Sequence, residues 1–344
     1  MEARRTAEGI RVGGDARQRL YDARGYGEPA PDGEIWLTPV EAVHLLRRGD
    51  LEAIDGLELR AFFGTIDEAD FFSRLVVYTD LRERGYYLDP IERLASEPTT
   101  AGTFAVYERG AGRSREALAF TVRVVEERET IPIVDLEATV LAVVDDECEV
   151  GYLESTELPI EGSVSFPDRP SEPFPATIAG NRGYAWEGGA RLYEAAFFGR
   201  PVGGRQAIDD VLALSLVETQ LLAERDYLAL DPAVVRQAGR NQEGQRYQRR
   251  YRAYRTLRTN GLVPKTGYKF GTDFRLYQAF EGLSQLSHSD WLVRVLAPTA
   301  SARPEDLSLD VRLAHGVGKR MVFAITPESE DQAVSWVSLT RVTP

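Results

Sequence analysis

Hydrophobic and polar residues follow two periods along this chain of 344 residues. Four segments repeat apolar residues every three or four positions, which predicts amphipathic helices; they are residues 37–46, 71–84, 214–222 and 247–259. Four shorter segments are rich in β-branched and other apolar residues, which predicts strands; they are residues 119–125, 140–144, 291–296 and 321–325. The pattern therefore predicts a mixed α/β (α+β) fold.

Local signals mark the ends of these helices. Thr38 and Ser215 stand at the start of the first helix of each half, and each is followed three residues later by glutamate, the spacing of a capping box. Gly85 and Gly261 follow the second helix, where glycine readily adopts the left-handed conformation that ends a helix. The same signals thus occur once in each half of the chain.

The order of these signals reflects an internal repeat. Five stretches recur in the same order at offsets of 170 to 177 residues; they are 19–29 and 191–201, 37–41 and 214–218, 78–85 and 254–261, 104–107 and 274–277, and 122–124 and 293–295. We interpret the chain as a tandem duplication of a unit of about 170 residues. Residues 159–175 contain five prolines and predict an extended linker between the halves.

Each repeat is expected to have two parts, a small N-terminal α/β subdomain and a strand-rich C-terminal α/β subdomain. The predicted subdomains are residues 1–85 and 86–165 in the first repeat, and 166–245 and 246–344 in the second. A chain of this length and apolar content can bury several cores, which suits such a division.

Charge is distributed unevenly along the chain. The net charge is −13, but residues 1–245 hold 26 basic and 45 acidic residues, whereas residues 246–344 hold 15 basic and 9 acidic residues. The acidic surface is typical of a high-salt cytoplasm, and the basic end is the footprint expected of a protein that binds a polyanion.

The single cysteine, Cys148, excludes an intrachain disulfide and a cysteine-rich metal site. No stretch approaches about 18 apolar residues, so we expect a cytoplasmic protein with no membrane partner.

Lysine is nearly absent from the chain. Of 41 basic residues only Lys265, Lys269 and Lys319 are lysine. An ammonium is a compact point charge, whereas a guanidinium is a planar fork, so a retained lysine indicates a role that arginine cannot fill. Lys319 lies downstream of Tyr277 and His288, and these three residues are the candidate catalytic set.

The two repeats differ at this set. In the register of the repeat, Tyr277 corresponds to Tyr107, His288 to Ala117 and Lys319 to Glu137. This is the pattern expected of a catalytic copy beside a structural copy. Taken singly, Tyr277 also fits an aromatic that closes a strand, and His288 a surface histidine. The other histidine of this segment, His315, is assigned a structural role.

Other chemistries fit the same segment less well. Gly316-Val-Gly-Lys319 resembles part of a phosphate-binding loop, but Leu313 stands where the first glycine belongs and Arg320 replaces the required Ser or Thr. No pair of carboxylates accompanies Lys319 as a metal-dependent nuclease would require, and Asp290 is the only carboxylate near His288. We therefore expect neither a metal nor another cofactor.

Three stretches carry a family resemblance. Gly267-Tyr-Lys-Phe-Gly-Thr-Asp-Phe-Arg-Leu-Tyr277, Ser287-His-Ser-Asp-Trp-Leu-Val293 and Val311-Arg-Leu-Ala-His-Gly-Val-Gly-Lys319 resemble the archaeal tRNA-splicing endonucleases. The resemblance is strong over about residues 247–344, and the two-repeat length resembles the homodimeric class. The family usually has a basic residue just before the lysine, where this chain has Gly318, so Arg320 becomes a candidate substitute cation.

The resemblance implies a restriction-endonuclease-like C-terminal subdomain that cuts precursor tRNA at intron boundaries in a bulge–helix–bulge. It implies 2′,3′-cyclic phosphate and 5′-hydroxyl ends, formed without a metal. Tyr277 would activate or orient the 2′-hydroxyl, although a phenol with an ordinary pKa near 10 is a poor base. His288 would protonate the leaving 5′-oxygen, and Lys319 would stabilise the pentacovalent transition state. The alternative is a non-catalytic RNA-binding subunit of a heteromeric splicing endonuclease, which predicts loss of this set.

The resemblance also implies contacts outside the catalytic set. An acidic loop, for which Asp145, Asp146 and Glu147 are the best candidates, would dock in a basic cleft of the partner in a homodimer. Arg312 and Arg341 would hold one bulge base from opposite subunits. Arg312 and Lys319 are seven residues apart, so on a single helix they would project from one face.

Overall fold

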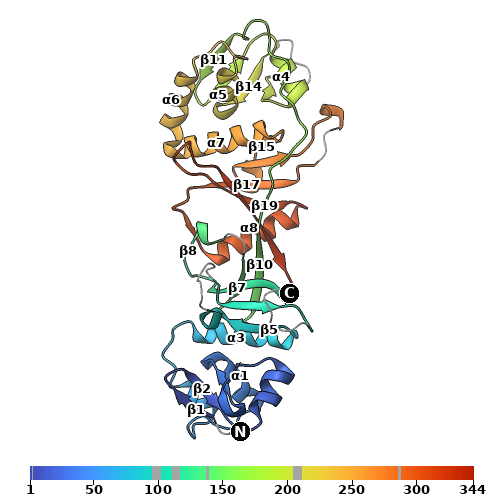
Figure 1. Cartoon of the computed structure of the whole chain (residues 1–344). Coiled ribbons are helices and arrows are strands. Elements are labelled where there is room, and N and C mark those ends of the chain that lie inside the picture. Colours follow the sequence, from blue (N-terminus) through green and yellow to red (C-terminus); the bar gives the residue numbers. More distant parts are fainter. Residues whose placement is uncertain (2, 95–101, 111–116, 137–138, 204–210, 286–287) are drawn as a thin grey trace.

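The protein is elongated, with a small α/β unit at each end and a long β-sheet between them (Figure 1). The structure, a computed structural model, describes the whole chain except residues 2, 95–101, 111–116, 137–138, 204–210 and 286–287. The N-terminus lies at one end and residues 176–243 form the other, while the C-terminus lies in the middle beside strands of the first half.

A ten-stranded sheet runs through the middle, and its strand order is symmetrical about the centre. The order is β15-β16-β17-β19-β20-β10-β9-β7-β6-β5. The second half contributes β15 (Val263–Thr266), β16 (Phe274–Tyr277), β17 (Trp291–Leu296), β19 (Arg320–Ile325) and β20 (Ser335–Val342). The first half contributes β5 (Tyr87–Pro90), β6 (Phe104–Tyr107), β7 (Leu118–Glu126), β9 (Val140–Val144) and β10 (Val150–Glu157). The central pair β10–β20 is antiparallel, whereas β7–β9 and β17–β19 are parallel. The two half-sheets therefore match strand for strand and join through β10 and β20.

The units at the two ends also match each other. One contains the sheet β1-β2-β4-β3, built from β1 (Ala3–Thr6), β2 (Gly9–Val12), β3 (Glu28–Pro29) and β4 (Ile35–Leu37). The other contains β11-β12-β14-β13, built from β11 (Ala176–Ala179), β12 (Arg182–Ala185), β13 (Arg200–Pro201) and β14 (Leu212–Ser215). A further small pair, β8 (Ile131–Pro132) with β18 (Ser301–Ala302), ties the two halves together beside the long sheet.

Helices pack against the two four-stranded end sheets and against the long sheet. They are α1 (Pro39–Arg48), α2 (Leu59–Phe63), α3 (Phe71–Glu83), α4 (Gly189–Ala196), α5 (Leu216–Glu224), α6 (Pro232–Glu243), α7 (Gln245–Thr259) and α8 (Pro304–Gly316). Short helical turns cover Arg17–Asp22, Pro31–Gly33, Ile91–Leu94, Ile133–Leu136, Tyr268–Phe270 and Leu283–Gln285. No described helix has the length and apolar character needed to cross a membrane.

The elements expected from the sequence are present. The four predicted helices are α1, α3, α5 and α7, and the four predicted strands are β7, β9, β17 and β19, with ends that differ by no more than two residues. Both predicted capping boxes form, Thr38 with Glu41 and Ser215 with Glu218. Residues 159–173 contain no helix or strand, as expected of a linker, and the linker packs on the second half, where Gly162 donates its N–H to Asn260 O at 2.8 Å.

Three buried clusters form the main cores. One fills the first end unit and the adjoining face of β6, β7 and β9, and a second does the same in the other half. The third takes residues from both halves; among them are Val125, Leu141, Leu153, Leu292, Phe323 and Val337, and it lies under α8. Because this core is shared, the two half-sheets are held together by packing as well as by the β10–β20 ladder.

Candidate active site

Tyr277, His288 and Lys319 line one small pocket of about 220 Å³. The rest of its lining consists of Phe270, Arg275, Ser289 and Val317. The topology explains the convergence. Since β16 is antiparallel to β17 and β17 is parallel to β19, the end of β16 and the starts of β17 and β19 meet at one edge of the sheet.

Tyr277 is the last residue of β16 and its side chain is almost completely buried. It lies opposite Val263 of β15, and its ring meets the Phe197 ring edge-on at 5.8 Å between centroids. The Arg275 guanidinium lies 5.7 Å from the tyrosine ring centroid. This packing fixes the ring direction, so the phenol is presented to the pocket by a rigid strand end rather than by a loop.

His288 is exposed and lies three residues before β17. The segment that carries it is anchored by Asp290. The Asp290 N–H donates to Leu276 O at 2.9 Å, its carbonyl accepts from Arg320 N–H at 3.1 Å, and its carboxylate accepts from Gln278 N–H at 3.3 Å. Asp290 therefore holds strands β16, β17 and β19 in place around the histidine.

Lys319 does not share a helix with Arg312, which corrects the expectation of a common helical face. Helix α8 ends at Gly316, and Gly318 adopts a left-handed conformation with φ of 67° that turns the chain into β19. The Lys319 N–H donates to Ala314 O at 2.9 Å, and its ammonium donates to Ser289 O at 2.5 Å. The turn therefore directs the ammonium towards the segment that carries the histidine. Because glycine adopts a positive φ at little cost, Gly318 suits this turn better than a basic residue would.

The strand pairing gives the same equivalences between the halves as the sequence repeat. Val293 lies opposite Phe274 and Val322, and Val122 lies opposite Phe104 and Val140 in the same way. Counting back from these pairs places Ala117 at the position of His288. The position of Lys319 corresponds to Glu137, which lies outside the described residues. Tyr107 ends β6 as Tyr277 ends β16, and both are buried.

Known protein families match this chain over both end units and over the segment that contains the small pocket. The family model for the tRNA intron endonuclease, catalytic C-terminal domain, matches residues 247–336, which include the whole pocket. The model for the N-terminal domain of that endonuclease matches twice, at residues 4–65 and 174–233. A tRNA-splicing endonuclease of Halobacterium salinarum is 47% identical over 97% of both chains, and one of Haloferax volcanii is 44% identical over 97% of both. One from Methanosarcina acetivorans is 33% identical over 97% of this chain and 98% of its own.

The chain belongs to the tRNA-splicing endonuclease family. Its acidic composition agrees with the halophilic archaeal sources of the two more similar relatives. The doubled N-terminal match places the same family unit in each half, in agreement with the matching end sheets.

The two arginines expected to clamp a base are both exposed. Arg312 lies on α8 and Arg341 lies near the end of β20. Neither lines the pocket of Tyr277. His315, assigned a structural role from the sequence, is an exposed residue in the last turn of α8, and its carbonyl accepts the Gly318 N–H at 2.9 Å.

The acidic loop forms a tight turn between β9 and β10. The Asp145 carboxylate accepts the N–H groups of Glu147 and Glu149 at 3.0 and 2.8 Å, so this residue shapes the turn. Asp146 and Glu147 are exposed, and Asp146 pairs with Arg128 at 2.6 Å. Of the three candidate docking residues, Asp146 and Glu147 are therefore the exposed ones, and Asp146 shares its charge with the exposed Arg128.

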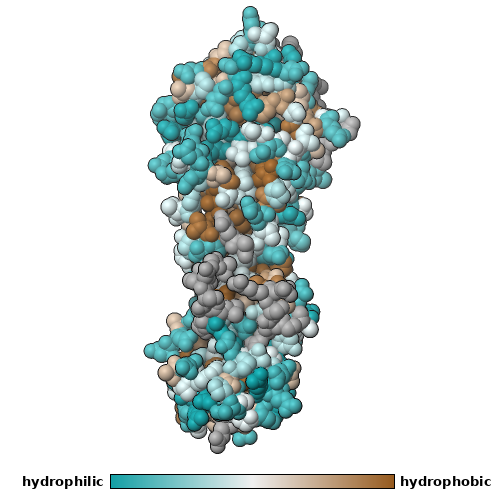
Figure 2. All heavy atoms as spheres, viewed as in Figure 1, coloured by the Kyte–Doolittle hydropathy of each residue, from teal (hydrophilic) through white to brown (hydrophobic). Residues whose placement is uncertain are grey.

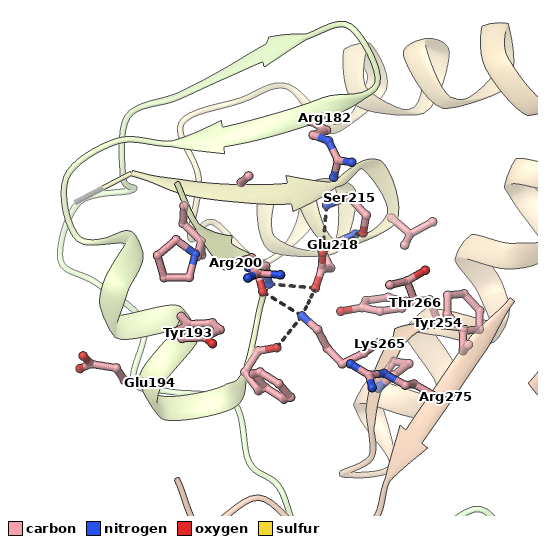
Figure 3. A pocket seen from close by; sticks show the side chains of 18 of the residues that line it. Arg182, Tyr193, Glu194, Arg200, Ser215, Glu218, Tyr254, Lys265, Thr266 and Arg275 are labelled. Atoms are coloured by element: carbon pink, nitrogen blue, oxygen red, sulfur yellow. Dashed lines mark hydrogen bonds and ion pairs between the residues drawn. The ribbon is translucent and has the colours of Figure 1, made fainter. Parts of the chain in front are cut away.

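A second, larger pocket of about 1060 Å³ lies between the second end unit and β15–β16 (Figure 3). Arg182 and Arg200 approach it from the end unit and Arg275 from β16, and Arg275 also lines the small pocket. None of these three arginines forms an ion pair with a described residue, and Nε of Arg275 is buried without a hydrogen-bond partner. The larger pocket is therefore a basic cleft. It shares one lining residue, Arg275, with the small pocket.

Lys265 and Glu218 form a buried ion pair in the wall of this cleft. The Lys265 ammonium donates to Glu218 at 3.2 Å and to the carbonyls of Phe197 and Gly199 at 3.0 Å (Figure 3). Burial alone would raise the pKa of Glu218, but the ammonium and the N–H groups of Gly199 and Ser215 lower it to about 2. Burial lowers the pKa of Lys265, and Glu218 opposes that shift. This lysine is retained because a compact ammonium satisfies three acceptors in a closed space.

Sequence reasoning assigned no role to four residues that line the small pocket, which are Phe270, Arg275, Ser289 and Val317. The Phe270 ring lies 5.8 Å from the Lys319 ammonium. A signal for Arg275 existed in the repeat, because β6 carries Ala105 at the equivalent position. Phe270 had no such signal, since its position depends on the turn between β15 and β16.

Proposed function

We propose that this protein cuts precursor tRNA at the intron boundaries of a bulge–helix–bulge, leaving 2′,3′-cyclic phosphate and 5′-hydroxyl ends. The observation that carries the proposal is the single pocket lined by Tyr277, His288 and Lys319 within the matched catalytic domain. In this reaction the 2′-oxygen bonds to the adjacent phosphorus, the bond from phosphorus to the 5′-oxygen breaks, and one proton leaves the 2′-hydroxyl while another reaches the 5′-oxygen.

Each residue has a separate role in this scheme. Tyr277, as the phenolate, orients the 2′-hydroxyl and takes its proton to become the neutral phenol, and His288, as the imidazolium, gives a proton to the leaving 5′-oxygen to become the neutral imidazole. The Lys319 ammonium stabilises the negative charge on the pentacovalent phosphorus. Because these side chains supply the base, the acid and the positive charge, the proposed reaction uses no metal ion and no other cofactor.

The function is tested by incubating the protein with a bulge–helix–bulge RNA in excess EDTA and analysing the new ends. Paired cuts with cyclic phosphate and 5′-hydroxyl ends are expected. Cleavage that stops in chelator and returns with a divalent cation contradicts the metal-free scheme. RNA binding without any cleavage favours the alternative, a non-catalytic subunit of a heteromeric enzyme; the intact residue set argues against that alternative.

We further propose that the protein acts as a homodimer in the cytoplasm. A bulge–helix–bulge has two scissile phosphates related by near-twofold symmetry, whereas one chain has one Tyr/His/Lys set. Two chains about a twofold axis supply two sites in matching geometry. Within each chain, the first repeat then comprises residues 1–85 and a degenerate catalytic-like unit at 86–165. The second comprises residues 166–245 and a restriction-endonuclease-like catalytic unit at 246–344.

The acidic turn of one subunit is proposed to dock in the larger basic cleft of the other. The turn presents Asp146 and Glu147, and the cleft presents Arg182, Arg200 and Arg275 without carboxylate partners among the described residues. Asp145 is less suited to this contact because its carboxylate is occupied by the turn. Complementary charges of this kind favour one relative orientation of two subunits.

Sedimentation of neutralised variants tests the docking. The double variant Asp146→Asn/Glu147→Gln and the cleft variant Arg182→Ala are each expected to weaken the dimer by about tenfold or more, as loss of interfacial charge pairs does. Glu172→Gln, an exposed change in the linker, is the matched control. A double variant that stays fully dimeric at low protein concentration contradicts the docking role of the turn.

A further inference from the structure

Tyr268 is more exposed than any other large hydrophobic side chain in the described part of the chain. Its exposed fraction is 86%, whereas the next, Val234, has 56%. Most of the face seen in Figure 2 at the N-terminal end is hydrophilic, and the hydrophobic patches lie mainly over the half built from residues 174–344. A ring left in water at this level loses the free energy that burial would provide, so its position requires an explanation.

The turn that carries this ring is rigid. Phe270 N–H donates to Gly267 O at 2.8 Å, and Gly271 N–H donates to Tyr268 O at 3.2 Å. A Cβ at Gly267 would lie 2.3 Å from Thr272 Oγ1, and Gly271 has φ of 67°. Both glycines are therefore required by close approach or by backbone conformation. The ring is exposed on a fixed backbone, which lowers the entropy cost of stacking a ligand on it.

The same turn forms part of the catalytic pocket. Phe270, two residues after Tyr268, lines the pocket beside the Lys319 ammonium. Lys269 between them is exposed, and Val317, another residue of the pocket lining, is 47% exposed. An exposed aromatic ring and an exposed cation thus directly precede Phe270 of the pocket in the same short turn. In the first half, residues 91–103 connect the equivalent strands and contain no aromatic residue.

We propose that Tyr268 is a stacking platform for the base of a nucleotide next to the scissile phosphate. Single-stranded bases are held by stacking on aromatic rings, and unpaired bulge nucleotides have free faces for this contact. Tyr268 positions the strand, while the groups in the pocket perform the chemistry. The inference rests on the proposed RNA cleavage and adds a positioning residue to it.

The test compares Tyr268→Ala, Tyr268→Phe and Tyr268→Trp on a bulge–helix–bulge RNA that carries 2-aminopurine at successive bulge positions. Tyr268→Ala is expected to raise KM by about 5- to 150-fold, the range for loss of one stacked base. The single-turnover rate at saturating RNA is expected to change much less. Phe and Trp should restore KM, and one 2-aminopurine position should lose its fluorescence quenching only in the alanine variant.

Phe72→Ala, which truncates an exposed aromatic residue of the first half, is the matched control and should leave KM unchanged. An unchanged KM for Tyr268→Ala overturns the proposal. So does an equal loss in Tyr268→Phe, which would assign the effect to the hydroxyl. Dissociation of the dimer in Tyr268→Ala would assign the ring to a protein contact and also overturn it. Failure of the wild-type protein to cut the RNA at all would instead overturn the proposed function.

Discussion

The two halves of this chain share the strand order of one scaffold and differ at the positions proposed for the chemistry. Their strands have the same order, helices α1 and α5 begin with the same capping box, and Tyr107 and Tyr277 occupy the same strand end. Around that tyrosine, the second half has His288 where the first has Ala117. A shared fold therefore gives each half a tyrosine of fixed position, and the additional acid and cation make only one of them a candidate catalyst.

The largest difference is expected in cleavage by variants of the candidate catalytic set. Tyr277→Phe, His288→Ala and Lys319→Ala should each slow single-turnover cleavage by about 10²–10⁴-fold, the usual contribution of a positioned acid or base. RNA affinity should stay close to that of the wild type, because none of these side chains is expected to supply most of the phosphate contacts. Rates from rapid mixing and Kd values from filter binding measure the two effects separately.

The first half provides the controls for these variants. Tyr107→Phe and Glu137→Ala change the positions that correspond to Tyr277 and Lys319 and should leave the rate unchanged. A rate of His288→Ala equal to that of the wild type would remove this histidine from the mechanism. A loss in Tyr107→Phe equal to that in Tyr277→Phe would mean that the tyrosine acts through the scaffold in both halves.

The two halves also pair an equivalent buried glutamate with different cations. Glu41 and Glu218 are both buried and accept equivalent N–H groups, from Gly27 and Gly199 respectively. In the first half the partner is Arg93, which also pairs with Asp89 at 3.2 Å. In the second half the partner is Lys265, whose position corresponds to Asp89. One of the three lysines is thus explained by burial rather than by catalysis.

Breaking either buried pair should be strongly destabilising. Lys265→Met and Arg93→Met each leave a buried carboxylate without its cation, and a loss of about 3–5 kcal/mol in the free energy of unfolding is expected. Lys265→Arg keeps the charge but must fit a larger group, so a smaller loss of about 1–3 kcal/mol is expected. Guanidinium unfolding followed by circular dichroism measures these values. Lys269→Met, an exposed control, should stay within about 0.5 kcal/mol, and a similarly small change for Lys265→Met would contradict the role of the pair.

His44 should make the stability of the first half sensitive to acid. It is buried between Tyr26 and Thr79, each at 3.2 Å, and burial together with the charge of Arg82 lowers its pKa to about 4. Between pH 6.5 and 4 the unfolded chain binds a proton that the folded chain does not bind. Stability therefore falls as the pH falls through this window, by about 3 kcal/mol in full, and levels off below it.

The second half supplies the matching substitution, because Leu221 occupies the position equivalent to His44. His44→Leu should remove the decline in stability measured by denaturant unfolding from pH 8 to pH 5. The low pKa of Glu218 acts only in a lower window, since that stability is lost as the pH falls from 4.5 towards 2. An unchanged decline in His44→Leu would assign the acid sensitivity to other groups.

Local hydrophobic patterns predicted the helices and strands well. They did not predict which distant strands pair with each other. Residues 140–144 were bounded correctly because a run of apolar residues has a strong strand signal. The pairing of β10 with β20 was not predicted, because these strands lie almost 180 residues apart in the sequence. The local sequence of neither strand indicates which strand it pairs with. The catalytic set could be proposed because duplication provides an internal reference, whereas the cleft of Arg182 depends on how an end unit packs against the long sheet.

The smallest expected effects concern Arg312, on a helix that has no equal in the first half, and Arg341, near the end of β20. Where the second half has α8, the first has the short turn Ile133–Leu136, and residues 129–139 contain no arginine. Arg312→Ala and Arg341→Ala should each weaken RNA binding by about 1–3 kcal/mol, the scale of a lost stacking contact. Arg303→Ala, at the start of α8, is the control and should change binding by less than about 0.5 kcal/mol.

Lysine at these positions separates a planar contact from a simple charge. An ammonium keeps the positive charge but has no plane on which a base can stack, so Arg312→Lys and Arg341→Lys should restore little of the loss. Cleavage at limiting RNA measures capture of the bulge, because the rate there follows kcat/KM. If Arg312→Lys cuts as fast as the wild type under these conditions, Arg312 contacts a phosphate rather than a base. The helix α8 would then add charge to the second half without reading the bulge itself.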